Sequence, residues 1–156
     1  MTPSTFQPLD IAAQWARMND TIIQLVDCIP DDKLNWSPKP DLWNFKGILI
    51  HICGSRHGWL ANTVIDGRQS PDVIGEAQTK DGIKRHLRLS WERMLPFLSD
   101  PAKLAATYED DWDGERVSLL GHWIAYHLLE HDIHHRADIF HYLALLGIET
   151  PQVSTP

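Results

Sequence analysis

Apolar residues recur at three- and four-residue steps along four stretches of the chain. This spacing places them on one face of an α-helix and predicts four amphipathic helices. The predicted helices cover residues 9–28, 44–65, 81–98 and 118–147. Helices of this number and length fit a four-helix bundle with one long connection before the last helix. We therefore expect an all-α fold and a single domain over residues 1–156.

Residues that start or stop helices stand at the ends of these stretches. Asn44 and Ser118 are expected to cap the second and fourth helices. Pro30 and Gly147 are expected to end the first and the fourth. The acidic, glycine-containing connection over residues 100–117 is predicted to form either a short hairpin or an irregular excursion.

The last predicted helix carries six of the nine histidines of the chain. His131 and His135 stand four residues apart, so both imidazoles lie on one helix face, within the apolar stripe. An unpartnered polar ring is costly in that position, and a pair with this spacing suits two ligands of one transition-metal ion. The alternative is a pair of core histidines that hydrogen-bond carbonyl groups or each other.

A further histidine, His51, falls on the apolar face of the second predicted helix. Helix bundles commonly hold metal ions between facing helices, so His51, His131 and His135 are expected to bind one divalent metal ion. Three protein ligands leave a coordination position open for water or substrate, as in catalytic zinc sites. His127, one turn before His131, is expected either to hydrogen-bond a ligand or to replace one. Asp138, three residues after His135, has the same two possible roles, with a helix-face salt bridge to Arg136 or another neighbour as the alternative.

Other histidines and the cysteine near His51 are not assigned to the site. His134 is expected to lie at an interface or outside the ligands, and His57 and His86 are expected to be solvated. Cys53 is two residues from His51, so on a helix it faces the other way and is expected to be a buried thiol.

Seven tryptophans are unusual for 156 residues. Large amphipathic rings suit a core or the wall of a pocket. Trp43, Trp59 and Trp123 are the candidates for a pocket wall beside the metal, with ordinary packing as the alternative.

The chain is acidic, with 21 acidic and 14 basic residues and a formal charge of −7. Because lysine and arginine form no cluster, we expect no nucleic-acid partner and no binding to an anionic membrane. No apolar run reaches the roughly 20 residues that span a bilayer, and the first ten residues lack the pattern of a signal peptide. Together with only two cysteines, this predicts a cytoplasmic location.

Two segments resemble the DinB/YfiT-like proteins: NWSPKPDLWNFKGILIHICGSRHGWL, residues 35–60, and EHDIHHRADIFHYLALLGIETP, residues 130–151. The first is similar to the connector and the helix that bears the first metal histidine in that family. The second is similar to the last helix, where a His-x-x-x-His pair is followed by arginine and later by glycine and proline. This chain departs from many members at Ala137-Asp138, where they have Gly-Gln.

The resemblance implies a four-helix bundle in which His51, His131 and His135 match the histidines that hold zinc or nickel. It also implies a homodimer. The activity that the resemblance implies is that of a metal-dependent hydrolase or of a low-molecular-weight-thiol S-transferase that acts on a small electrophile. A non-catalytic metal- or ligand-binding stress-response protein is the alternative, and a purely structural histidine site is a third interpretation.

Overall fold

The computed structural model describes residues 10–152. Within this range the chain forms four long helices, two short helices, one 3-10 turn and one pair of strands. In chain order the elements are α1 (Ile11–Cys28), η1 (Asp31–Lys33), α2 (Phe45–Asn62), α3 (Val73–Glu76), α4 (Lys80–Leu98), α5 (Pro101–Ala105), β1 (Thr107–Trp112), β2 (Glu115–Leu120) and α6 (Gly121–Leu145).

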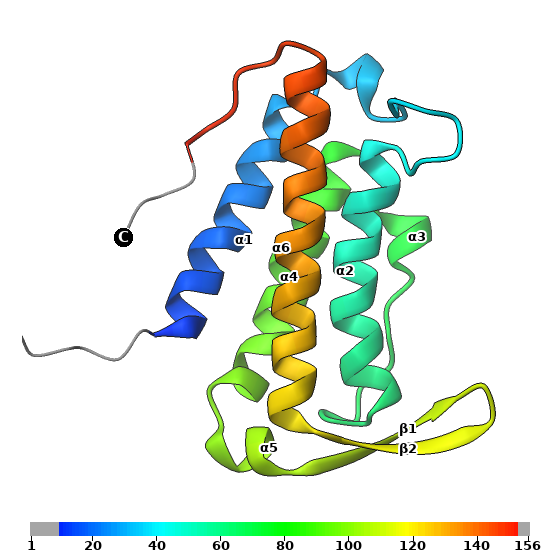
Figure 1. Ribbon diagram of the computed structural model, residues 1–156, viewed down its shortest axis with the longest axis vertical. Helices are drawn as coiled ribbons and strands as arrows, with labels where there is room; N and C mark the ends of the chain where they lie inside the picture. The colour runs from blue at the N-terminus through cyan, green and yellow to red at the C-terminus, as the bar shows by residue number, and fades with distance from the viewer. Residues whose placement is uncertain (1–9, 153–156) are drawn as a thin grey trace, which may run out of the picture.

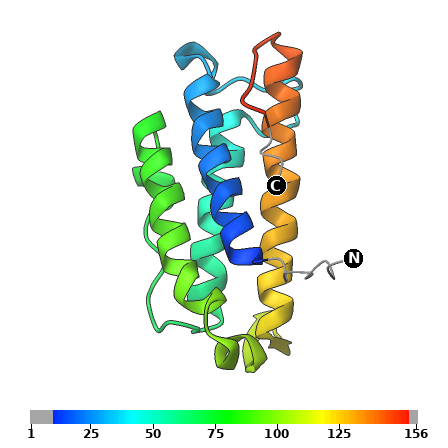
Figure 2. The ribbon, with the colours of Figure 1, turned by 90° about the vertical axis from the view of Figure 1, so that its left-hand side faces the viewer.

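The four long helices lie side by side. In Figure 1, α6 stands between α1 and α2, with α4 behind them, and the view turned by 90° in Figure 2 shows α1 between α4 and α6. Helices α1 and α2 each pack against both α4 and α6. The mainly helical fold class is thus confirmed, with a small two-stranded sheet in addition.

All four long helices contribute side chains to one apolar core. Burying each such aliphatic side chain contributes about 1.5–3 kcal/mol, so this core fixes which face of each helix turns inward. It also fixes which faces of α2 and α6 meet at their common boundary. Representative core residues with no exposed surface are Ile22, Leu25, Ile52, Leu87 and Leu128.

The ends of the long helices follow from local chemistry. The Asn44 side chain accepts a hydrogen bond of 2.8 Å from the backbone N–H of Gly47, so its predicted role as the cap of α2 is confirmed. Gly147 follows α6 with a φ of +69°, the conformation of a helix-terminating glycine. Helix α2 ends at Asn62, a few residues earlier than predicted.

The connection between α4 and α6 contains a hairpin, which was one of the two predicted alternatives. Glu109 of β1 pairs with Ser118 of β2. Asp113 and Gly114 form the turn with φ values of +55° and +84°, a combination that suits a tight hairpin. The prediction that Ser118 caps the last helix was wrong, because this residue lies within β2 and α6 begins at Gly121.

Over residues 10–152, none of the helices combines the length and the apolar character needed to cross a membrane. The N-terminal residues on which the signal-peptide prediction depends lie mostly outside this range.

Candidate metal centre

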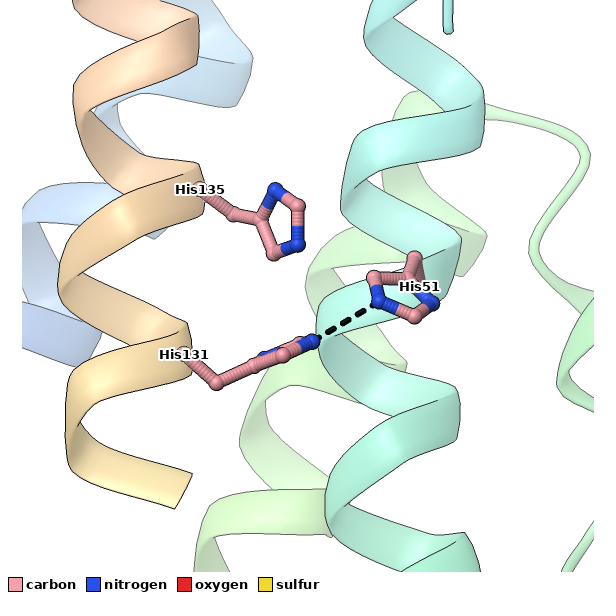
Figure 3. A group of neighbouring side chains, drawn as sticks. All are labelled: His51, His131 and His135. Atoms are coloured by element: carbon pink, nitrogen blue, oxygen red, sulfur yellow. Dashed lines mark hydrogen bonds between the residues drawn. The ribbon is translucent and has the colours of Figure 1, made fainter. Parts of the chain in front are cut away.

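The packing of α2 against α6 brings three predicted site residues together. Figure 3 shows His131 and His135 projecting from successive turns of α6 toward His51 on α2. One ligating atom of each ring lies within 4.8 Å of the other two. The Nε2 atoms of His51 and His131 are 2.8 Å apart, so one donates a hydrogen bond to the other.

The three imidazoles suit a divalent transition-metal ion. Burial, together with the nearby His131 and His135 rings, lowers the pKa of His51 to about 4. Burial and the His131 ring also lower the pKa of His135. Near pH 7 both rings are therefore neutral and have a lone pair to donate to a metal. A metal ion held by all three residues would take the place of the hydrogen bond between His51 and His131.

The cluster is partly exposed, and His127, the next histidine along this face of α6, does not close it. The side chains of His131 and His135 are each 14% exposed. The His127 ring stacks on Trp123, with ring centroids 5.2 Å apart and an interplanar angle of 4°. Its centroid lies 6.3 Å from that of His131. His127 is therefore not placed as a fourth ligand.

Asp138 lies within hydrogen-bonding distance of one candidate ligand, as one of its predicted roles requires. Its Oδ2 atom lies 3.1 Å from Nδ1 of His135. A proton on Nδ1 donates to this carboxylate and leaves Nε2 of His135 free to bind a metal. Asp138 also lies 3.8 Å from His134, whose side chain is 71% exposed. His134, His135 and Asp138 form a second group that could hold a metal ion. This group shares His135 with the three-histidine cluster, so the two groups are alternatives.

Ser55 joins the cluster, although the sequence had not indicated a role for it. It follows His51 by one helical turn, and its Oγ atom lies 3.3 Å from Nε2 of His131. A hydroxyl group at this place can hydrogen-bond a molecule held beside the histidines. The sequence feature that could have identified Ser55 was its position four residues after His51, which puts both side chains on one face of the helix.

A buried ion pair lies beneath the cluster. Arg56 and Asp132 approach to 2.8 Å, and neither side chain has exposed surface. Arg56 also donates to Asn19 and to the carbonyl oxygen of Leu87, and Trp15 donates to Asp132 at 2.7 Å. Burial opposes ionisation of Asp132, but Arg56 and the hydrogen bonds hold its pKa below the ordinary value. The network therefore joins all four long helices through one carboxylate and one guanidinium group.

This network also adjoins the histidine cluster. Asp132 follows His131 in sequence, and Arg56 follows Ser55. Among the residues that the structure describes, His131 Nδ1 and Asp132 Oδ1 are buried without hydrogen-bond partners, and they lie 3.9 Å apart. Metal-ligating histidines normally donate their second N–H to such an oxygen. A small movement that brought these two atoms within hydrogen-bonding distance would let Asp132 orient His131 once Nε2 binds a metal.

The three tryptophans predicted to form a pocket wall lie in two different parts of the structure. The Trp43 ring lies 4.4 Å from that of His51 and stacks at 5.9 Å on that of His135, so it borders the cluster. Trp59 and Trp123 contact each other with ring centroids 5.8 Å apart. They lie around His127, one turn away from the cluster along α6.

Two histidines differ from the prediction. His57 and His86 were expected to be solvated, which was wrong, because they are 4% and 1% exposed. Arg93 lies 3.2 Å from His57 Nδ1, and Glu76 lies 3.1 Å from His86 Nε2. Each charged partner satisfies one ring nitrogen, while His57 Nε2 and His86 Nδ1 are buried without a hydrogen-bond partner within residues 10–152. Cys53 is buried, as predicted, and burial raises the pKa of its thiol to about 12, which makes it unreactive.

Comparison with known proteins was consistent with this architecture. The chain is similar to a DinB-like protein from Bacillus subtilis, with 21% identity, a TM-score of 0.69, and coverage of 94% of this chain and 99% of that one. It is also similar to a DinB-like protein from Bacillus cereus, with 17% identity, a TM-score of 0.70, and coverage of 91% and 94%. At these identities the likeness shows a common fold. A search of curated proteins found no match. The family model described as DinB family matches residues 1–156, so the chain belongs to the DinB family.

Proposed function

We propose that the protein is a divalent-metal-dependent enzyme of the hydrolase or low-molecular-weight-thiol S-transferase type, which acts on a small electrophile. The observation that carries the proposal is the convergence of His51, His131 and His135 at a partly exposed boundary between two helices. Three imidazole ligands leave a coordination position for water or substrate. Zinc and nickel are the proposed ions, since both bind imidazole well.

When bound, such an ion lowers the pKa of a coordinated water or thiol and so supplies a nucleophile near neutral pH. The residues of the chain provide the positioning. Asp138 accepts a hydrogen bond from the Nδ1–H group of His135 and so fixes that ring. Ser55 Oγ lies beside His131 and can hold the substrate or the nucleophile by a hydrogen bond. Trp43 packs against the rings and keeps water from one side of the cluster.

The four long helices are taken as a DinB-type four-helix bundle, with α5 and the hairpin in the long connection before α6. Several expectations stay predictions. They are a homodimer, a small-molecule substrate, a thiol cosubstrate, the absence of a nucleic-acid partner and a cytoplasmic location. Light scattering on the purified protein tests the homodimer by its mass.

A non-catalytic metal- or ligand-binding protein is the alternative function. A site closed by a fourth protein ligand would favour it, and His127 was the candidate for that ligand. His127 instead stacks on Trp123, away from the three rings. This arrangement supports the open, catalytic kind of site.

The test compares turnover by metal-stripped protein with turnover after reloading with zinc or nickel. Turnover is measured with two panels of substrates. The panel for hydrolysis contains 4-nitrophenyl esters, and the panel for thiol transfer contains aryl halides and epoxides with cysteine or glutathione as the thiol. The proposal predicts turnover that requires metal, is lost in His51→Ala and is kept in His134→Ala. If metal-loaded protein shows no turnover above free metal ions in either panel, the binding function is favoured.

A further inference from the structure

An apolar hollow of about 360 Å³ lies between α2 and α3, and His51 is the one of the three histidines that lines it. Two of its lining residues, His51 and Ser55, also belong to the candidate metal centre. Trp43, Ile50 and Ile74 contribute apolar surface to it. Among the described residues that line this α2–α3 hollow, none is Asp, Glu, Lys or Arg. The hollow and the metal centre therefore form one continuous surface, polar at the histidines and apolar beyond them.

Gly54 lines the hollow in the interior of α2, where glycine destabilises a helix relative to alanine. Neither packing nor backbone conformation requires a glycine at this position. A Cβ atom added at Gly54 would meet nothing within 4 Å, and its φ is not positive. A side chain at this position would instead project into space beside His51. The absence of a side chain at Gly54 thus keeps the hollow open.

The rim of the hollow exposes large apolar side chains. Ile74 is 71% exposed and Trp43 is 51% exposed. Such groups next to a polar cluster characterise ligand sites, which are mostly apolar with a few polar groups that fix orientation. The volume is at the lower end of the range of about 300–1,000 Å³ that is usual for small-molecule pockets.

We propose that the α2–α3 hollow binds the uncharged, apolar substituent of the substrate while the reacting group of the substrate lies at the three histidines. This inference rests on the proposed function and specifies the class of electrophile, which is a small molecule with an alkyl or aryl substituent rather than a charged one. Gly54 determines specificity, because a side chain there takes up space that the substituent occupies, and a bulky one fills it.

The test uses n-alkyl hydroxamates as probes, from acetohydroxamate to hexanohydroxamate, with the zinc-loaded protein. The hydroxamate group binds the metal, and the alkyl chain is varied. Calorimetry gives the dissociation constants. Each added methylene group should strengthen binding to the wild-type protein about fourfold while the chain is being buried. In Gly54→Leu this dependence on chain length should disappear, while acetohydroxamate still binds.

Gly58→Leu is the matched control, since Gly58 is also a glycine of α2 with nothing within 4 Å of an added Cβ, but it does not line the hollow. It should keep the dependence on chain length found in the wild-type protein. Zinc content and melting temperature establish that both variants are folded and loaded. The milder variant Gly54→Ala should retain binding of the short chains and lose only that of the longest.

Two outcomes would overturn the inference. The first is equal affinity for all chain lengths in the wild-type protein, and the second is an unchanged dependence on chain length in Gly54→Leu. If the dependence is unchanged in Gly54→Leu and lost in Trp123→Ala, the chain lies on the α6 side of the cluster. In either case, binding of acetohydroxamate would still support the open metal site. Failure of zinc-loaded protein to bind acetohydroxamate at all would instead defeat the proposed function, and the inference with it.

Discussion

The Nε2 atoms of His51 and His131 lie 2.8 Å apart, although 80 residues separate the two histidines in sequence. The packing of α2 against α6 brings the rings together, and one donates a hydrogen bond to the other. The geometry of the histidine cluster is thus part of the folded chain itself. A metal ion that binds there binds the folded state in preference to the unfolded one.

Zinc or nickel should therefore stabilise the folded protein. At a free-metal concentration of about 100 times the dissociation constant, the free energy of unfolding should rise by about 2.7 kcal/mol. Chemical denaturation with and without metal measures this difference. In His51→Ala the gain should fall sharply, and an equal gain in that variant would contradict the three-histidine assignment.

The buried ion pair should be essential for stability. Asp132→Ala leaves the Arg56 guanidinium buried without its partner and should cost about 3–5 kcal/mol. The double variant Arg56→Met with Asp132→Leu should recover much of this loss, because two apolar side chains need no charged partner. Both are measured by urea denaturation at pH 7.

Asp138→Ala is the control for this prediction. Its carboxylate lies on the same helix but is 37% exposed, so its removal should cost less than about 1 kcal/mol. Equal losses in Asp132→Ala and Asp138→Ala would show that the buried pair has no special role.

Acid should destabilise the protein through His57. Burial, with Arg93 and His86 nearby, lowers its pKa from 6.5 to about 4. Between these values the unfolded chain binds a proton that the folded chain does not. The free energy of unfolding should therefore fall as the pH falls from 6.5 to about 4 and level off below that range. Since a difference of one in pKa corresponds to about 1.4 kcal/mol, the full loss from this residue approaches about 3 kcal/mol.

His57→Asn should remove this contribution, because the amide oxygen can accept the hydrogen bond from Arg93 without titrating in this range. Unfolding curves at a series of pH values compare the two proteins. A slope should remain in the variant, since the pKa of His51 is also lowered to about 4. Identical slopes in the two proteins would contradict a buried, neutral His57.

Replacement of Gly54 should show that the fold does not require this glycine. Gly54→Ala should raise the free energy of unfolding by about 0.5–1 kcal/mol, because alanine is the better helix former and its Cβ meets nothing within 4 Å. Gly82→Ala is the contrast, since its Cβ would lie against the backbone carbonyl of Glu76. That variant should be destabilised, and a loss of stability in Gly54→Ala would show a structural need for glycine there.

The helices and the histidine cluster could be predicted because the signals for them are local. Apolar spacing located the long helices, Asn44 and Gly147 marked helix ends, and the spacing of His131 and His135 set both rings on one face. The placement of His51 on the inner side of another helix was enough to identify it as the third candidate ligand. Each of these signals is read from a single helix, and only the meeting of His51 with the other two rings depends on the packing of α2 against α6.

What the sequence did not reveal depends on contacts between elements. Asp132, not a histidine, occupies the fully buried position of α6 between Leu128 and Ile139. His131 and His135 lie at the edge of that stripe, where they face α2. A charged residue in an apolar stripe is interpretable only when its partner is known, and Arg56 lies 76 residues away in sequence. The burial of His57 likewise depends on Arg93 of α4.

The most direct test of the metal centre is elemental analysis of untagged wild-type protein, His131→Ala and His134→Ala after exposure to zinc or nickel and removal of the excess. His134 is the matched control, since its side chain is 71% exposed on the same helix. The three-histidine site predicts about one metal ion per chain in the wild-type protein and in His134→Ala, and almost none in His131→Ala. Full metal content in His131→Ala, or a wild-type protein that takes up neither ion, would contradict it.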